Sequence, residues 1–432
     1  MTERHGWREW WRTLERHGAA RSALAAVLEN RAVPVNAAEE PAAHARTVPC
    51  DLLVVHDEVN RLHGTGLLLL AVFGRGPRMA TVRSHGFYGG EQEFGFRAVH
   101  LPLGDIPRPT VYARALEALP DLDVRRILCV PYYEDDARTA VALHDLFGAP
   151  LCTWVMDDQN VADHRIGDAA MRELLAKSRL RLAIGPELRA AYEEKYGDRF
   201  YLAPPLVNGP DVLAGEAPGP GPGGRPLMVG NVWGKRWLDD LRRVVREAGL
   251  ELDWTSPSAY RFERMEVDEL ARDGIRCLGT LEGASYLERL RAATFVLVPT
   301  GTLGPDDDRA AVARFSVPSR MPFTLAAAHS PMIVVGSKDT AAAHFVERLG
   351  VGRAVPYDAA ALRAAADEVS KPDAQVVLRA RSAALAPSFS AAGMAEWIWA
   401  SLAAGAPVDQ RFERLGLAPG AGEEGKRWAS GR

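Results

Sequence analysis

Short apolar runs alternate with amphipathic stretches along most of the chain. Runs of about four to eight residues rich in Val, Ile and Leu predict buried strands, and apolar residues that recur every three or four positions predict helices between them. Strands that alternate with helices build right-handed βαβ units around a parallel sheet. In the first half of the chain the expected strands are 51–55, 80–83, 98–101, 126–130, 151–156, 180–184 and 200–202, and the expected helices are 67–73, 110–119, 136–147, 168–178 and 186–196.

A stretch rich in Pro and Gly, residues 208–226, interrupts the alternation and marks a domain boundary. The alternation then restarts, so we expect an α/β protein with two Rossmann-like domains that face each other across a cleft, where open α/β sheets bind ligands. The expected strands of the second half are 227–229, 250–255, 276–278, 295–299, 332–335 and 353–355, with helices at 235–247, 284–293 and 340–349 and further helices from 359 and 374. The expected divisions are a helical extension (1–45), an N-terminal domain (46–208), a linker (209–226), a C-terminal domain (227–390), a last amphipathic helix (391–404) and a mobile tail (405–432).

Composition narrows the functional classes. The 432 residues are 47% apolar and 25% charged, which are values of a globular protein. The net charge of −4 argues against a nucleic-acid partner, because such proteins usually carry a basic excess. The cysteines are scattered without metal-ligand spacing, so they are expected to be reduced thiols of a cytoplasmic protein, and no apolar run approaches the roughly 18 residues of a spanning helix. The four are Cys50, Cys129, Cys152 and Cys277.

The N-terminal extension carries three tryptophans at helical spacing, Trp7, Trp10 and Trp11, with arginines between them. A helix of this kind over residues 5–16 would lie on the inner face of a membrane, with its aromatic side in the interface. The alternative is a helix that packs its tryptophans onto the domain behind it.

Residues 315–336, FSVPSRMPFTLAAAHSPMIVVG, combine a proline, a hydroxyl and an arginine at a helix start with a buried strand behind the helix. The free N–H groups and positive dipole end of a helix N-terminus attract anions, and Arg320 adds a fixed charge beside Pro318 and Ser319. The segment therefore predicts an anion site. The alternative is an ordinary βαβ unit with a surface arginine.

Two glycine-containing turns stand between a strand and a helix. The first holds Gly64, Thr65 and Gly66 and the second holds Gly230 and Asn231, followed by Lys235 and Arg236. Glycines let a backbone approach a ligand closely, and the following helix N-terminus can hold phosphate. The first turn departs from a dinucleotide fingerprint, because Leu69 stands where a third glycine is needed. The alternatives are a tight strand-to-helix turn and a helix start with solvated cations.

Carboxylates and a histidine at strand ends are candidates for catalysis. Asp157 and Asp158 follow strand 151–156 and could bind acceptor hydroxyls or act as a base, although Asp158 could equally cap the next turn. His63 flanks the first glycine turn, and it is either a substrate contact or a packing residue. The run 306–308, three aspartates, lies in a loop over 300–314 that is expected to be solvated, so no essential metal is expected.

These stretches together resemble GT-B glycosyltransferases, and within them the retaining family 4 type, over roughly residues 48–404. The resemblance implies that the Pro318–Arg320 run, the helix after it with Thr324, and the two glycine turns bind a nucleotide-diphosphate sugar such as a UDP- or GDP-sugar. The sequence departs from the family at Phe323 and Thr324, where an acidic residue is usual, and at 328–331, Ala-His-Ser-Pro, where Gly-x-Pro is usual.

The family's final helix commonly crosses back onto the first domain, and helix 391–404 could do so. The resemblance further implies sugar transfer to a hydroxyl acceptor (a glycan, a lipid-linked molecule or a small molecule), with retention of configuration and without an essential cofactor. Two alternatives stay open: a nucleotide-sugar epimerase on the same fold, and a GT-B module that binds without turnover.

Overall fold

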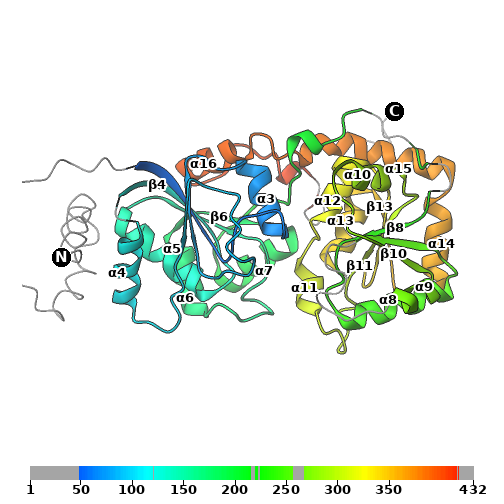
Figure 1. The fold of residues 1–432 in the computed structure, drawn as a ribbon, viewed down its shortest axis with the longest axis horizontal. Coiled ribbons are helices and arrows are strands. Elements are labelled where there is room, and N and C mark those ends of the chain that lie inside the picture. Colours follow the sequence, from blue (N-terminus) through cyan, green and yellow to red (C-terminus); the bar gives the residue numbers. More distant parts are fainter. Residues whose placement is uncertain are drawn as a thin grey trace, which may run out of the picture. The chain divides into compact units, whose positions relative to one another are not determined.

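The computed structural model describes residues 48–119, 121–215, 219–221, 224–255, 267–415 and 417, which form two compact units (Figure 1). The N-terminal unit contains the described chain up to Ala183 together with Ala191–Tyr201 and Gly393–Val408. The C-terminal unit contains Ile184–Ala190, Leu202–Ala392 and the described chain from Asp409. The expected helical extension, with its tryptophans, and the tail beyond residue 417 lie outside the described residues.

A seven-stranded sheet, in the order β3-β2-β1-β4-β5-β6-β7, is the centre of the N-terminal unit. The chain places β1 beside β4 although β2 and β3 lie between them in sequence, so the strand order reverses at the β1–β4 pair. Val55 pairs with Val130 and Arg83 in parallel register, which ends the three strands at one level. The strands are β1 (Val48–Val55), β2 (Met79–Arg83), β3 (Arg97–His100), β4 (Leu122–Val130), β5 (Leu151–Val155), β6 (Ser178–Ala183) and β7 (Tyr201–Leu202).

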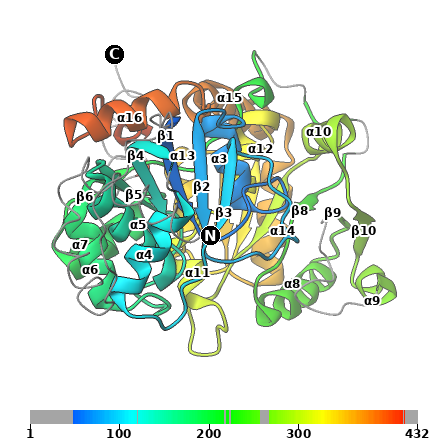
Figure 2. The same cartoon turned by 60° about the vertical axis from the view of Figure 1, so that its left-hand side comes forward.

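Helices connect these strands and cover the sheet. Figures 1 and 2 both show α4, α5 and α6 together, and α16 beside α3. Helix α16 is distant in sequence, but it packs on this unit because Trp397, Ile398 and Leu402 form a buried apolar side. The Arg126 guanidinium lies 4.5 Å from the ring centroid of Trp399 on the same helix. The helices are α3 (Gly64–Phe73), α4 (Arg108–Ala118), α5 (Glu134–Phe147), α6 (Asp168–Lys177), α7 (Pro186–Tyr196, shared by the two units) and α16 (Met394–Ala404).

The C-terminal unit is built on a six-stranded sheet in the order β10-β9-β8-β11-β12-β13, and its strand order reverses between β8 and β11. Every residue of β11 and β12 is buried, as the continuous apolar runs predict for a parallel sheet covered on both faces. The strands are β8 (Leu227–Val229), β9 (Leu252–Thr255), β10 (Ile275–Gly279), β11 (Val296–Pro299), β12 (Met332–Val335) and β13 (Gly352–Val355). The helices are α8 (Lys235–Glu247), α9 (Val267–Arg272), α10 (Gly283–Ala292), α11 (Ala310–Phe315), α12 (Arg320–Ala328), α13 (Ala341–Leu349), α14 (Ala359–Val369) and α15 (Pro372–Leu385).

The α/β class and the two parallel sheets confirm the sequence prediction. Two local expectations are wrong. Helix α3 begins at Gly64 rather than after Gly66, because His63 occupies the N-cap position and its Nδ1 accepts the N–H of Gly66. The loop over 300–314 ends in helix α11, and Asp307 and Asp308 accept hydrogen bonds from protein N–H groups. No helix among the described residues is long and apolar enough to cross a membrane.

Candidate functional site

The end of β8 and the start of α12 meet at the strand-order reversal of the C-terminal sheet. Arg320, the first residue of α12, donates from Nη1 to the carbonyl oxygens of Val229 and Asn231, both at 2.8 Å. Gly230 between them has φ +78°, a left-handed conformation that side chains disfavour. A Cβ atom at Gly230 would also lie 3.0 Å from Arg320 Nη1. The arginine therefore fixes the shape of the second glycine turn.

The Arg320 guanidinium has no counter-ion among the described residues. Its Nε is buried without a hydrogen bond, and no described carboxylate pairs with it. Burial lowers the pKa of Arg320 to about 10, while the nearby phenols of Tyr286 and Tyr357 partly oppose that shift. Burial also raises the pKa of Tyr286 to about 12 and raises the pKa of Tyr357 well above 10, so both phenols are neutral near pH 7. A buried cation without an anion is costly, and a bound anion would offset that cost.

The N-terminus of α8 is occupied by the loop that precedes α11. Asp308 Oδ2 accepts the backbone N–H of Lys235 at 3.1 Å, and a Cβ atom at Gly234 would lie 2.6 Å from Asp308 Oδ1. Asp307 accepts from Trp237 Nε1 at 2.7 Å and from the N–H of Leu303 at 2.9 Å. Asp306 and Asp308 are exposed, as expected for a solvated run, whereas Asp307 is only partly exposed. The carboxylates of Asp307 and Asp308 accept hydrogen bonds from N–H groups at the starts of helices and turns.

Lys235 and Arg236 pair with carboxylates of their own helix. Lys235 Nζ lies 2.9 Å from Asp239 Oδ2, and Arg236 Nε lies 3.0 Å from Asp240 Oδ2. Both are exposed i,i+4 pairs, which contribute only about 0.3–0.5 kcal/mol. A ligand could displace them, but the structure gives neither cation the uncompensated position of Arg320.

The rest of the predicted anion segment forms the first turns of α12. Ser319 is the N-cap residue but its side chain makes no capping hydrogen bond, and the carbonyl of Pro318 accepts the N–H of Met321 at 2.8 Å. Thr324 is buried, and its Oγ1 has no hydrogen-bond partner. Thr324 therefore packs within the unit with an unpaired hydroxyl, and its role in donor binding stays a prediction.

The first glycine turn has mainly a packing role. A Cβ atom at Gly66 would overlap the carbonyl oxygen of Asn60, so only glycine fits beneath this backbone. His63 Nε2 lies 2.7 Å from the carbonyl oxygen of Glu58, and the His63 ring stacks on Tyr88 with centroids 4.9 Å apart. The turn is a tight strand-to-helix turn with Gly64 exposed at its start, and a role of Gly64 and Gly66 in ligand binding stays a prediction.

Thr65 and Asp157, which sequence analysis proposed for different roles, are joined by Tyr132. The Tyr132 hydroxyl donates to Asp157 Oδ2 at 2.6 Å and lies 2.8 Å from Thr65 Oγ1. Burial and the Asp157 charge raise the pKa of Tyr132 well above 10, so the phenol keeps its proton. Tyr132 follows the end of β4 after Pro131, beside the strand-order reversal of the N-terminal sheet. The sequence shows Tyr132 only as a polar residue at a strand end. Its contacts with Thr65 and Asp157 depend on the strand order, which the sequence does not show.

Asp158 caps its own loop. Its two carboxylate oxygens accept backbone N–H groups at 2.7 to 3.1 Å, and they face the chain rather than a substrate. The donors are Asn160, Val161, Ala162 and Asp163. Because both oxygens are engaged, Asp158 takes the capping role that sequence analysis named as its alternative.

Two buried carboxylates that sequence analysis missed hold the loop after β2. Asp57 Oδ1 accepts the N–H of Phe87 at 2.9 Å, and Glu58 accepts the N–H groups of Tyr88 and Gly90 while pairing with Arg83 at 3.0 Å. Burial raises the pKa of Asp57 to about 6, and hydrogen bonds from its neighbours lower the pKa of Glu58 to about 2 despite its burial. The pair therefore fixes the backbone that carries exposed aromatic side chains.

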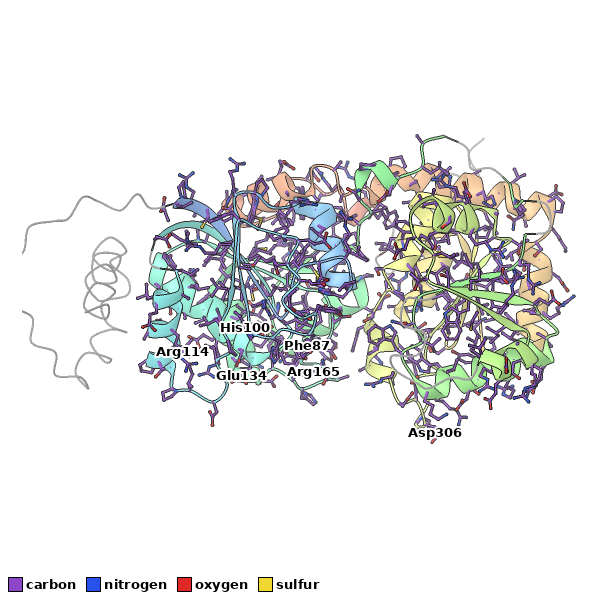
Figure 3. The ribbon with its side chains drawn as sticks, viewed as in Figure 1. Phe87, His100, Arg114, Glu134, Arg165 and Asp306 are labelled. Atoms are coloured by element: carbon purple, nitrogen blue, oxygen red, sulfur yellow. The ribbon has the colours of Figure 1, made fainter. Side chains whose placement is uncertain are left out.

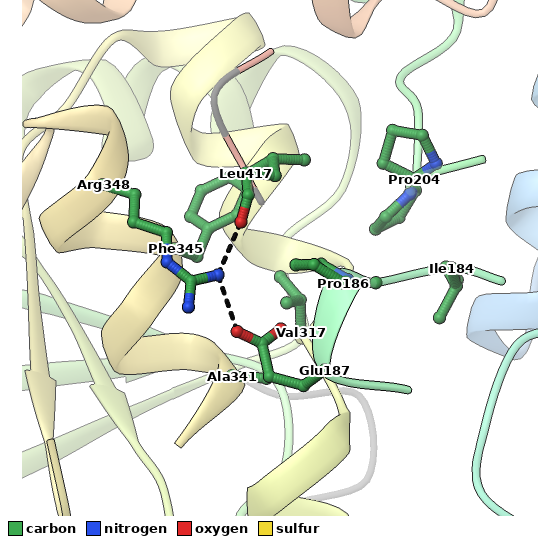
Figure 4. Close-up of a pocket in the computed structure, with 11 residues that line it drawn as sticks. Ile184, Pro186, Glu187, Pro204, Val317, Ala341, Phe345, Arg348 and Leu417 are labelled. Atoms are coloured by element: carbon green, nitrogen blue, oxygen red, sulfur yellow. Dashed lines mark hydrogen bonds and ion pairs between the residues drawn. The ribbon is translucent and has the colours of Figure 1, made fainter. Parts of the chain in front are cut away.

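The described residues contain no cluster of His, Cys, Asp and Glu with metal-binding geometry. A small hollow in the C-terminal unit is lined mainly by apolar side chains such as Pro204, Val317 and Phe345 (Figure 4). Its charged groups bind one another, because Glu187 Oε1 lies 2.7 Å from Arg348 Nη1. The hollow therefore offers no uncompensated charge to a substrate.

No family model and no curated protein matches the chain. Among solved structures of the GT-B fold, it resembles HepE (Alr3699) of Anabaena, solved in complex with UDP, with a TM-score of 0.56 and 12% identity over 82% of this chain and 100% of that one. It also resembles trehalose-6-phosphate synthase, OtsA, with a TM-score of 0.54 and 12% identity over 82% of this chain and 99% of that one. At such low identity the likeness concerns the fold alone. The chain therefore has the GT-B fold, with two Rossmann-like domains each built on a parallel sheet.

Proposed function

We propose that the protein transfers a sugar from a nucleotide-diphosphate sugar to a hydroxyl acceptor. The observation that carries this proposal is the partly buried Arg320 guanidinium, whose Nε is fully buried and which lies at the strand-order reversal of the C-terminal sheet without a carboxylate partner among the described residues. Ligands of open α/β sheets bind at such reversals, beyond the carboxyl ends of the strands. A diphosphate is the anion that a nucleotide-sugar donor would bring to this cation.

The chemistry of sugar transfer needs positive charge where the leaving diphosphate becomes more negative. A fixed cation in a site of low polarity stabilises that charge without reorganising as the reaction proceeds. Arg320 is held in place by two carbonyl oxygens at Nη1, while Nη2 makes no hydrogen bond with the described residues. We propose that Nη2 donates a hydrogen bond to a phosphate oxygen of the donor. The backbone of Gly230 and Asn231 would let that phosphate approach closely.

Lys235 and Arg236 are assigned a supporting role, since a ligand must first displace Asp239 and Asp240 from them. Transfer with retention of configuration and without a metal ion accords with the resemblance stated above. UDP is the first nucleotide to test, because HepE was solved with it.

On the acceptor side, Asp157, oriented by Tyr132, is the proposed partner of the reacting hydroxyl. A cytoplasmic location stays a prediction.

A thermal-shift screen with UDP, GDP and their sugars tests the proposal. A ligand at 100 times its dissociation constant stabilises the folded state by about 2.7 kcal/mol, which is a readily measured rise in melting temperature. We expect one nucleoside diphosphate to raise the melting temperature, and the matching sugar donor to release it when an acceptor is present. If no nucleoside diphosphate shifts the transition, the proposal is wrong. Conversion of the donor to another nucleotide sugar without release of the diphosphate would support the epimerase instead.

A further inference from the structure

A buried carboxylate in the C-terminal unit gathers arginine side chains from three segments of the chain. The Asp253 side chain, on β9, is 0% exposed. Its Oδ1 lies 2.8 Å from Arg276 Nε and 3.5 Å from Arg225 Nε. Its Oδ2 accepts hydrogen bonds from Arg276 Nη2 at 2.9 Å and from Arg289 Nη2. Arg276 belongs to β10, which Figure 2 shows at the outer edge of the sheet beyond β9, whereas Arg225 precedes β8 and Arg289 lies in the last turn of α10.

This arginine cluster, Arg225, Arg276 and Arg289, carries more positive charge than its carboxylate partners offset. The second partner is Glu251, which lies 2.9 Å from Arg225 Nη1 but is 74% exposed, so that ion pair is weak. Burial alone would raise the pKa of Asp253, but the hydrogen bonds and charges of Arg276 and Arg289 hold it below its usual range. Asp253 is therefore ionised near pH 7 and balances one guanidinium, which leaves a surplus of positive charge at this place.

The guanidiniums keep unused N–H groups that a ligand can reach. Arg276 Nη1 and the Nε and Nη1 atoms of Arg289 make no hydrogen bond with the described residues, and Arg225 Nε is buried without one. The side chain of Arg276 is 51% exposed and that of Arg289 is 40% exposed. A ligand can therefore approach from solvent while the Asp253 carboxylate holds the guanidiniums in place from the side of the sheet.

A compact oxyanion with two negative charges suits this arrangement. Arg276 Nη2 and Arg289 Nη2 donate to the same oxygen atom of Asp253, so the two guanidiniums converge on one point. The planar fork of arginine matches the oxygens of a phosphate group, and a fork that is already held in place loses little freedom on binding. A phosphate group carries about 1.5–2 negative charges near pH 7. An acidic peptide would instead need cations spread along a surface.

We propose that the arginine cluster is a second anion site, which binds the phosphate group of a ligand other than the nucleotide-sugar donor. Arg276 and Arg289 donate to the phosphate oxygens, and Asp253 positions both guanidiniums. The site is separate from the proposed donor site, because Arg225 precedes the start of β8 whereas Arg320 bonds to the carbonyl oxygens at its end. The inference does not rest on the proposed function. The phosphate group belongs either to free inorganic phosphate or to a phosphomonoester, and the chemistry of recognition is the same.

Phosphorus NMR titrations of the full chain with inorganic phosphate and with glycerol 3-phosphate test the site, with chloride keeping the ionic strength constant. Tighter binding of glycerol 3-phosphate indicates a phosphomonoester, and equal or weaker binding indicates the free ion. Arg276→Gln and Arg289→Gln should each weaken the binding at least fivefold. Arg272→Gln is the matched control, because it removes the same charge from a side chain that is 74% exposed and pairs with Glu269 only at 4.0 Å. We expect the control to change the affinity by less than about twofold.

Arg276→Lys keeps the folded protein testable if glutamine at this position unfolds it, since it retains the charge and loses only the fork. We expect it to melt like the parent and to bind phosphate more weakly than the parent. Arg320→Ala should retain the binding within about twofold, because its side chain belongs to the proposed donor site.

Four results would overturn the inference. These are no binding of either phosphate probe to the parent, unchanged binding by both glutamine variants, loss of binding in Arg320→Ala, or binding of hexaglutamate but of neither phosphate probe. The melting-temperature shift with UDP or GDP is measured on the same samples. A nucleotide shift without binding of either phosphate probe contradicts the second anion site alone, whereas phosphate binding at the arginine cluster without any nucleotide shift contradicts the proposed function alone.

Discussion

Replacing Asp308 by asparagine should make the protein bind nucleoside diphosphates more tightly. The Asp308 carboxylate occupies the N-terminus of α8 through the N–H of Lys235, at 3.1 Å. In the proposed donor site a diphosphate competes for this helix terminus, so the native carboxylate opposes the ligand. Asparagine keeps an oxygen that accepts the same hydrogen bond and removes only the charge.

The size of the effect follows from two contributions. A negative charge at an exposed helix N-terminus gains about 0.3–1 kcal/mol from the helix dipole, and a ligand that displaces it forfeits that gain. Two unit charges about 4 Å apart in water repel by about 1 kcal/mol. Together they predict about 1–2 kcal/mol, or roughly 5- to 30-fold tighter binding of the diphosphate for Asp308→Asn.

Isothermal titration with UDP or GDP at low salt measures this change, and the gain should shrink as ionic strength rises. Asp306→Asn is the matched control, because Asp306 lies at the exposed part of the same loop (Figure 3) and makes no hydrogen bond or ion pair with the described residues. We expect the control to change the dissociation constant by less than about twofold. Unchanged or weaker binding by Asp308→Asn would show that the diphosphate does not use the α8 terminus.

Three further predictions concern stability and cofactor use. Burial lowers the pKa of His56 to about 3, so the folded protein holds this ring in its neutral form. The resulting contribution to the free energy of unfolding is complete above pH 6.5 and is lost as the pH falls. Between pH 7 and pH 5 the parent should lose about 2 kcal/mol relative to His56→Gln in urea unfolding, and parallel pH profiles would refute this. Gly230→Ala should cost roughly 1–2 kcal/mol more than Gly89→Ala, because both glycines have positive φ but only Gly230 lies against Arg320; equal midpoints in urea would contradict the contact. Transfer activity should survive EDTA, and loss with recovery on adding manganese would show a metal requirement.

The fold could be predicted from the sequence because its signals are local. Continuous apolar runs such as Met332–Val335 become fully buried parallel strands, and the amphipathic stretch 235–247 forms a helix with the expected bounds. The start of α3 was misplaced because His63 caps the helix earlier than the glycine pattern suggests. Capping by a histidine depends on side-chain geometry that periodicity does not report.

The candidate site was only partly predictable, because its contacts join distant segments. Arg320 was found from the helix start, but its hydrogen bonds to Val229 and Asn231 depend on β8 and β11 being neighbours. Asp308 lies more than seventy positions from Lys235, so its hydrogen bond to the N–H of that residue could not be read from the sequence. The contacts of the Tyr132 hydroxyl with Thr65 and Asp157 depend on the strand order, which brings the three residues together.

The most direct test of the account is the affinity of Arg320→Ala for the nucleoside diphosphate that stabilises the parent protein. A charge-assisted contact contributes about 1.5–3 kcal/mol, so the dissociation constant should rise at least tenfold while the circular dichroism spectrum is retained. Arg236→Ala is the comparison, since its guanidinium is already paired with Asp240, and it should change affinity by less than about threefold. If Arg320→Ala binds the diphosphate as tightly as the parent, the guanidinium only supports the glycine turn through its hydrogen bonds to Val229 and Asn231, and the donor site lies elsewhere.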